Sequence, residues 1–117
     1  MTATNQNATV YAGDYLEIEV PVLDPSGGTI SPAGMTARYK VGKNSASTEA
    51  LISKDSGGGI VITTVDGTMF LTITLDPADT ASLPPRSYYH EVEVTDIGGR
   101  PFTVMIGHLE VVGTLIK

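Results

Sequence analysis

The stretch that decides the fold is residues 83–96, LPPRSYYHEVEVTD, together with the return segment up to residue 111. From Tyr88 onward, apolar and polar residues alternate with a period of two, as in a half-buried β-strand. Residues 97–99, Ile-Gly-Gly, supply a turn whose glycines can take a positive φ. The pattern predicts the last β-hairpin of a sandwich, with these side chains facing inward: Tyr88, His90, Val92, Val94, Phe102, Val104, Ile106, Leu109 and Val111.

Gly107 interrupts the inward series of the second strand, because Leu109 and Val111 resume it one residue out of step. One extra residue at a glycine is typical of a β-bulge, so we expect a bulge at Gly107. In this register His90 points into the core and His108 points outward. Because the two rings would lie on opposite faces, a hydrogen-bonded core His90 is favoured over a zinc site shared with His108.

The rest of the chain reads as short strands separated by turn clusters rich in Gly, Asp and Pro. Asp66-Gly67 is a strong hairpin signal between two of them. Pro21 cannot donate a ladder hydrogen bond, which indicates an edge or a bulge. Pro77 suits the first position of one short helical turn near 77–82. The strands are expected at 8–11, 14–23, 35–41, 50–52, 60–64 and 69–75.

Seven to nine short strands with almost no helix predict an all-β fold, namely an antiparallel β-sandwich with Greek-key connections. A small barrel is the alternative. The 117 residues suit one domain, and no internal repeat is visible. We expect a flexible N-terminal arm at 1–7, a single sandwich domain at 8–112 and a C-terminal tail at 113–117.

Composition narrows the possible partners. The net charge of −6 argues against a general affinity for nucleic acid or anionic membranes. There is no cysteine, hence no disulfide framework and no thiolate metal site. The polar N-terminus lacks the basic start and apolar core of a signal peptide, so export by that route is not expected.

No constellation of residues predicts catalysis, and we expect no catalytic residue, no metal and no cofactor. There is no Gly-x-Ser-x-Gly elbow and no phosphate loop. Paired carboxylates could cleave glycosides, but a solvated strand face explains Glu17, Glu19, Glu91 and Glu93 more simply. Loop aspartates could bind calcium, although no stretch has a calcium-loop spacing and turn aspartates usually bond their own backbone. These are Asp24, Asp55, Asp66 and Asp96.

Tyr88 has the most specific structural interpretation. In Greek-key sandwiches a tyrosine often begins the penultimate strand and donates its hydroxyl to the backbone across the preceding corner. Asp79 and Leu83 stand where that corner would be. A partly buried aromatic without this hydrogen bond is the alternative.

A set of short motifs runs along most of the chain, namely Gly13-Asp14, Gly27-Gly28, Arg38, Asp79-Thr80-Ala81-Ser82-Leu83, Tyr88, Glu91-Val92-Glu93-Val94, Gly107, Leu109 and Val111. With these motifs the chain resembles the small immunoglobulin-like domains of tailed-phage and prophage structural proteins, and is similar to the N-terminal domains of upper baseplate proteins. The resemblance covers about residues 8–112. The family pattern has Gly two residues before the tyrosine, whereas this chain has Arg86.

The resemblance implies an immunoglobulin-like sandwich that serves as a non-enzymatic structural component of a tailed-phage virion. The component would belong to the tail, baseplate or neck, or would decorate the capsid. It would be assembled in the host bacterial cytoplasm and would contact other virion proteins, including copies of itself. A carbohydrate-binding module is the alternative, although such modules usually present a row of exposed aromatics, and this chain has no Trp.

Partner contacts are expected at the termini, loops and edge strands. The arm at 1–7 has no large apolar residue to anchor it to its own core. Leu115 and Ile116 follow the last strand, where two exposed aliphatics would suit a partner surface. Edge strands other than the one with Pro21 could accept a strand from another chain.

Overall fold

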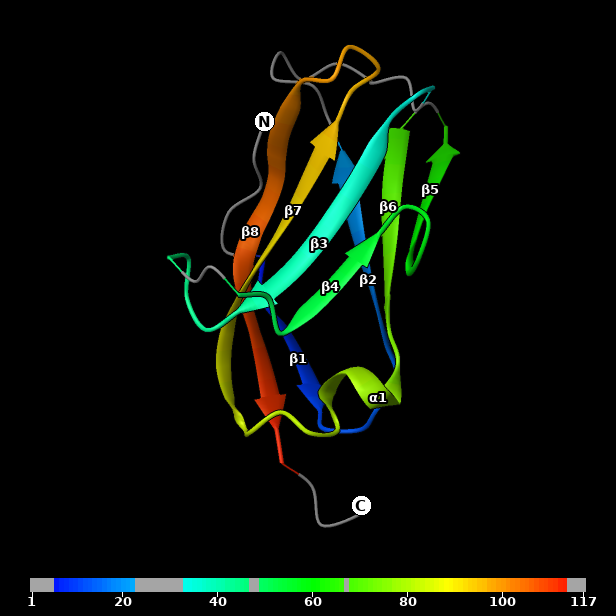
Figure 1. The fold of residues 1–117 in the computed structure, drawn as a ribbon. Helices are drawn as coiled ribbons and strands as arrows, with labels where there is room; N and C mark the ends of the chain where they lie inside the picture. The colour runs from blue at the N-terminus through cyan, green and yellow to red at the C-terminus, as the bar shows by residue number, and fades with distance from the viewer. Residues whose placement is uncertain (1–5, 23–32, 47–48, 67, 114–117) are drawn as a thin grey trace.

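The computed structural model describes residues 6–22, 33–46, 49–66 and 68–113. It contains eight strands and one short helix (Figure 1). The elements are β1 (Ala8–Tyr11), β2 (Leu16–Val22), β3 (Thr36–Gly42), β4 (Ile52–Asp55), β5 (Ile60–Val65), β6 (Thr68–Leu75), α1 (Pro77–Thr80), β7 (Arg86–Thr95) and β8 (Pro101–Val112).

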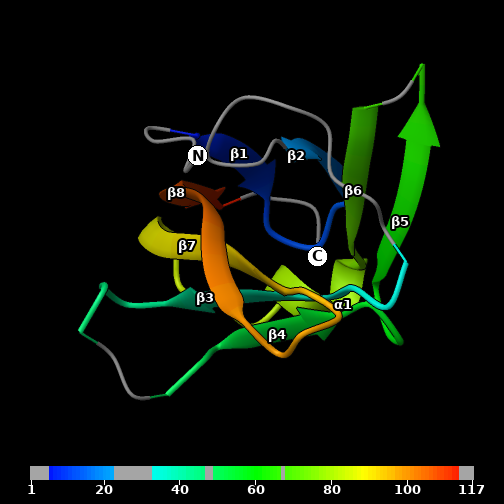
Figure 2. The same ribbon diagram turned by 90° about the horizontal axis from the view of Figure 1, so that it is seen from above.

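The strands form two sheets, ordered β1-β8-β7-β3-β4 and β2-β6-β5. The layers are visible from above in Figure 2. This order matches the immunoglobulin arrangement, in which strands B, E and D form one sheet and G, F and C the other. β2 is an edge strand, as Pro21 predicted. The predicted antiparallel β-sandwich is confirmed, and among the described strands β1 pairs in parallel, with β8.

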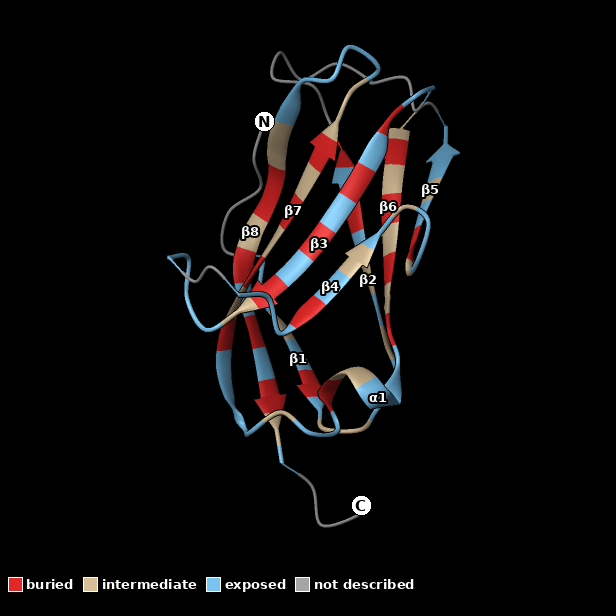
Figure 3. Ribbon diagram, viewed as in Figure 1, coloured by how far each residue is buried: buried red, intermediate tan, exposed pale blue. Residues whose placement is uncertain are grey.

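Alternation places the core between the sheets. Along β3, buried residues alternate with exposed ones, and along β7 they alternate with half-buried ones (Figure 3). The inward side chains of β6 (Met69, Leu71, Ile73 and Leu75) are fully buried. Burial of a large aliphatic side chain is worth about 1.5–3 kcal/mol, so this apolar layer is the main stabilising feature of the sandwich.

The β7–β8 hairpin has the expected turn but a different bulge. Val94 pairs with Phe102, whereas Val92 pairs with Met105, so the extra residue in β8 is Val104. The predicted bulge at Gly107 was therefore wrong. Val104 and Met105 are both buried, and from Met105 onward the inward series runs unbroken through Gly107 to Val111.

The register change has a physical cause. Gly107 faces inward and lies against the backbone of Gln6, where no Cβ could fit. The glycine therefore continues the inward row instead of interrupting it. Ile106, predicted to face inward, pairs with Glu91 and is only half-buried, and Met105 takes the core position.

The helical turn is shorter than the predicted 77–82 and ends at Thr80. Its first turn is capped by Asp79, whose carboxylate accepts a hydrogen bond from the backbone N–H of Asp76 at 2.7 Å. The Thr80 hydroxyl accepts a hydrogen bond from Gly13 N–H at 3.0 Å, which ties the β1–β2 connection to α1.

The last two residues of the predicted arm belong to the fold. Gln6 N–H donates to the carbonyl of Ile106 at 3.1 Å, and the Asn7 side chain accepts from His108 N–H at 2.9 Å. The expectation of a free arm was therefore wrong for these two residues, because their polar groups find partners on β8. Residues 1–5, and the predicted contact residues Leu115 and Ile116, lie outside the described part of the chain.

Candidate functional site

The outer face of the β1-β8-β7-β3-β4 sheet carries charged residues, and four of them lie in cross-strand pairs of opposite sign. Arg38 forms an ion pair with Glu93, and Lys40 lies opposite Glu91 in the register of β3 and β7. Charge attraction from Glu93 and its hydrogen bond raise the pKa of Arg38. Cross-strand pairs of opposite charge stabilise neighbouring strands. This face is therefore stable in contact with water.

The outer face of the other sheet has a different composition. Its β5 margin presents Val61, Thr63 and Val65, and Phe70 on β6 pairs with Thr63. Val61 is 57% exposed and Val65 is 54% exposed. The carboxylates of this face, Glu17 and Glu19, lie on β2 at the opposite edge of the sheet. The β5 margin is therefore an uncharged surface of β-branched side chains.

β5 is also an edge strand. In the sheet order it has β6 as its neighbour on one side, and no described strand pairs along the other side. Figures 1 and 2 show β5 at the margin of the molecule. An edge strand exposes unpaired N–H and C=O groups, which a strand from another chain can bind. The sequence pattern of this segment predicted only a hairpin. The available signal was the uncharged run 60–65, bounded by Gly59 and Asp66.

A groove of about 710 Å³ lies at the end of the sandwich that carries α1. Tyr11 is 54% exposed, and Asp14 contributes a carboxylate at the same place. The remaining walls are apolar or small. The lining residues are Tyr11, Ala12, Gly13, Asp14, Pro77, Ala78, Ala81, Leu83, Pro85 and Gly113.

The tyrosines are divided between the core and this end of the molecule. Tyr39 and Tyr88 are buried, and Tyr89 is half-buried against His108. Tyr15, 58% exposed, follows the groove residues along the chain. A hydrogen bond with Glu17 raises the pKa of the Tyr15 phenol.

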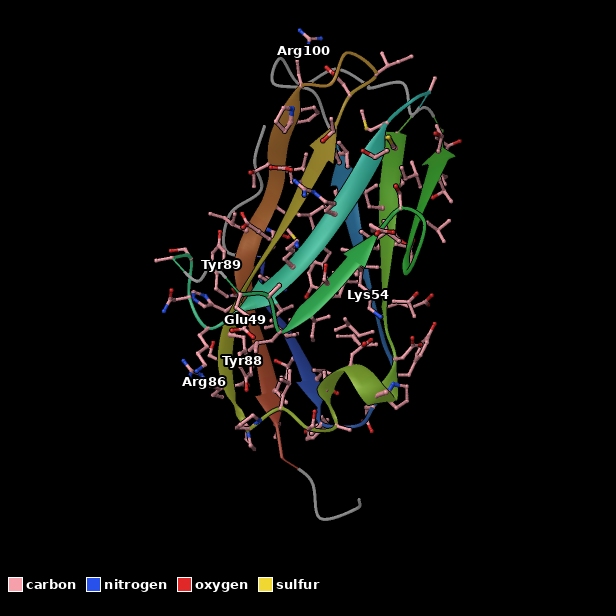
Figure 4. All side chains as sticks on the ribbon, in the orientation of Figure 1. Glu49, Lys54, Arg86, Tyr88, Tyr89 and Arg100 are labelled. Carbon is pink, nitrogen blue, oxygen red and sulfur yellow. The ribbon has the colours of Figure 1, made fainter. Side chains whose placement is uncertain are left out.

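Tyr88 makes the hydrogen bond expected at the corner. Its hydroxyl donates to the carbonyl of Pro84 at 2.5 Å. Leu83 packs against the core, and its N–H donates to Thr80 at 3.0 Å. Arg86, two residues before the tyrosine, lies with its guanidinium 5.4 Å from the centre of the Tyr88 ring (Figure 4). The arginine therefore covers the corner tyrosine.

Asp79, the third predicted corner residue, has a different partner. Lys54 on β4 reaches α1 and forms an ion pair with Asp79 at 2.8 Å (Figure 4). Both side chains are mostly shielded from solvent, at 13% and 21% exposed. The pair links the β4 edge to the helical turn. Sequence spacing could not identify it, because the two residues come from different layers.

The two histidines lie as predicted on opposite faces. His90 is fully buried and His108 is exposed. His90 Nδ1 lies 2.9 Å from the Tyr39 hydroxyl, and Nε2 lies 2.6 Å from the Gln6 carbonyl oxygen. Because a carbonyl can only accept, Nε2 carries the proton and Nδ1 accepts from Tyr39. Burial lowers the pKa of His90 and raises that of Tyr39, so both groups are neutral.

Two of the loop aspartates, Asp55 and Asp96, bond their own turns. Asp55 accepts from Gly57 N–H at 2.9 Å, and Asp96 accepts from the N–H groups of Gly98 and Arg100. These bonds, above all the one from Arg100, lower the pKa of Asp96. The described residues contain no group of three potential metal ligands, and no helix among them is long and apolar enough to cross a membrane.

No family model and no curated protein matches this sequence. A solved structure described as the GspB Siglec domain aligns with a TM-score of 0.55 at 16% identity, over 92% of this chain and 54% of that one. A family 123 glycoside hydrolase from Clostridium perfringens aligns with a TM-score of 0.44 at 15% identity, over 96% of this chain and 23% of that one.

The C-terminal domain of the Streptococcus agalactiae AgI/II polypeptide BspA aligns with a TM-score of 0.40 at 14% identity, over 92% of this chain and 45% of that one. This chain thus spans about half the length of the GspB structure. At 16% identity the likeness concerns the fold alone. The chain is a β-sandwich domain with a fold similar to that of the GspB Siglec domain.

Proposed function

We propose that this chain is a non-enzymatic structural component of a tailed-phage virion that acts through protein–protein contacts. It would sit in the tail, baseplate or neck, or decorate the capsid. The observation that carries the contact function is the uncharged, exposed edge strand β5. The virion context comes from the family resemblance of residues 8–112.

The physical argument rests on the contrast between the two outer faces. The face with Arg38 and Glu93 carries charged residues, and these two form an ion pair with each other. β5 exposes two valines on the outer face of its sheet. Along the edge that points away from β6, it also exposes backbone groups to which no described strand is paired. Covering β-branched side chains and satisfying backbone groups at the same time is favourable, and a neighbouring protein supplies both.

The test is incorporation into particles. Particles purified from a strain that carries the gene should contain the protein in a fixed copy number, measured by quantitative mass spectrometry and located by electron cryomicroscopy. Thr63→Lys on the β5 edge should reduce incorporation, because it places a charge within the contact surface. Ser53→Lys, at an exposed position of the β4 edge, is the matched control. Absence of the wild-type protein from purified particles would overturn the proposal.

A second candidate is a carbohydrate-binding module, which the groove beside α1 favours. Tyr11 offers a ring to stack on a sugar, and Asp14 offers an acceptor for hydroxyl groups. The neighbour named as a Siglec domain has the same fold. Binding to a glycan array, measured for wild type, Tyr11→Ala and the control Tyr15→Ala, tests this candidate. Binding that Tyr11→Ala alone abolishes would support this candidate, and no binding to any glycan would reject it.

A further inference from the structure

We propose that β5 pairs antiparallel with β5 of a second copy of this chain, about a two-fold axis at Thr63. The pairing would join two β2-β6-β5 sheets into one continuous six-stranded sheet. This inference deepens the proposed contact function, on which it rests, by naming the partner of that edge. A two-fold pairing is closed, since each edge is satisfied by its copy.

The backbone of β5 can make such a ladder. Thr74 N–H donates to the Gly59 carbonyl at 2.8 Å, and the register continues with Val61 opposite Thr72. In an antiparallel ladder, hydrogen-bonded pairs alternate with pairs that are not hydrogen-bonded. The odd-numbered residues of β5 therefore bond to β6. The N–H and C=O groups of Ile62 and Thr64 point to the open side.

The side chains are complementary to themselves. With the axis at Thr63, the two copies of Thr63 lie opposite each other, and Val61 of each copy lies opposite Val65 of the other. All three side chains lie on the outer face, and all are β-branched. Cross-strand pairs of β-branched residues stabilise antiparallel strands. The pairing would cover the two most exposed valines of the described chain, Val61 and Val65.

The distribution of charged residues favours β5 over the β2 and β4 edges. The chain has a net charge of −6, so two copies repel each other, and the repulsion is weakest where they meet at an uncharged surface. The β2 edge carries Glu17, Glu19 and Pro21, and the β4 edge carries Lys54 and Asp55. Glu17 and Glu19 lie on β2, which is two strand spacings, roughly 10 Å, from β5. This distance is about one Debye length at physiological salt, so their charges are largely screened at the β5 edge.

β1 is also uncharged, but it is a weaker candidate. It has four residues against six in β5, and Glu110 lies directly beside Thr9 on the neighbouring strand. Even the β5 contact is short, so the area it buries is below that of a standard stable interface, about 1,200–2,000 Å². The isolated protein should therefore dimerise weakly, and more strongly as salt screens the negative charge.

A disulfide test exploits the absence of native cysteine. In the proposed register the two Thr63 residues form a pair without mutual hydrogen bonds, with Cα atoms about 4.5 Å apart, within the range for a disulfide. Thr63→Cys should therefore give a disulfide-linked dimer under mild oxidation. The rate should exceed that of the control Ser53→Cys by roughly tenfold or more, because pairing raises the local thiol concentration.

The register has its own check. Val61→Cys and Val65→Cys should each crosslink slowly alone and rapidly when mixed, since these positions face each other. Sedimentation equilibrium supplies a measurement without cysteine: Thr63→Lys should abolish the salt-strengthened dimer, and Ser53→Lys should leave it intact. Equal crosslinking at positions 63 and 53, or a wild type that stays monomeric at every salt and protein concentration, would overturn the inference. Incorporation into particles by such a monomeric protein would leave the proposed function standing.

Discussion

The imidazole Nε2 of His90 donates a hydrogen bond to the backbone carbonyl oxygen of Gln6, 2.6 Å away and 84 positions earlier in the chain. The ring is fully buried, and its other nitrogen accepts from the Tyr39 hydroxyl. One core side chain thus joins Gln6, which precedes β1, to β7 and β3. Both polar partners would lose a hydrogen bond without it.

Replacing His90 tests this connection. His90→Leu keeps a similar volume but leaves the Gln6 carbonyl and the Tyr39 hydroxyl without this partner. The free energy of unfolding should fall by about 2–6 kcal/mol, since each of the two unsatisfied buried groups costs about 1–3 kcal/mol. Urea unfolding measures the change. His108→Leu, at the exposed histidine, should stay within about 0.5 kcal/mol of wild type; equal losses in the two variants would contradict the buried network.

Acid should weaken the fold through His90. Burial lowers its folded-state pKa below the ordinary value of 6.5, so the unfolded chain binds the proton more readily. The stability contributed by neutral His90 is complete above pH 6.5 and declines as pH falls from there through the folded-state pKa. The urea midpoint of wild type should decline over this range, and that of His90→Leu should decline less.

Asp96 makes a separate contribution to stability, and its loss begins at a lower pH than the loss of the His90 contribution. The hydrogen bond from the Arg100 backbone lowers the pKa of this carboxyl below 3.8. The stability it contributes is therefore present above pH 3.8 and is lost only as pH falls further. An Asp96→Asn variant should match the wild-type pH profile near pH 6 and differ from it in strong acid. A difference near pH 6 would contradict the assignment of that range to His90.

Gly107→Ala should displace the N-terminal segment. A Cβ at this position would lie 2.6 Å from the carbonyl carbon and 2.8 Å from the nitrogen of Gln6, in addition to meeting its carbonyl oxygen. The expected loss of stability is about 1–3 kcal/mol, the usual cost of overpacking. Hydrogen exchange at residues 6–11 should increase as well. Gly57→Ala, in an exposed turn where the nearest atom is 3.4 Å away, is the control and should change neither quantity.

Tyr88→Phe should remove the hydrogen bond to Pro84 while keeping the ring in place. Loss of a partner for this carbonyl is expected to cost about 1–3 kcal/mol, seen as a lower melting temperature. Tyr89→Phe is the matched control, because the Tyr89 hydroxyl reaches Glu91 only at 3.5 Å. If the two variants melted at the same temperature as wild type, the corner would have no measurable role.

Local alternation in the sequence was enough to predict a sandwich of short strands, the inward rows of β3, β6 and β7, and the burial of His90. The reason is that a pleated strand sends successive side chains to opposite faces, so a period of two in hydrophobicity maps directly onto burial. The turn at Asp96 and the tyrosine corner also follow from short-range chemistry.

The position of the β8 bulge and the edge position of β5 depend on contacts between segments distant in sequence, so only the tertiary structure decided them. Gly107 looked like a break in β8 because nothing near it in sequence indicates that Gln6 lies against it. The bulge therefore moved to Val104, and Met105 entered the core. The edge position of β5 was also decided by tertiary structure. Residues 60–65 show in the sequence that the strand is uncharged. Only the sheet order β2-β6-β5 places the strand at an edge, where its backbone can pair with another chain.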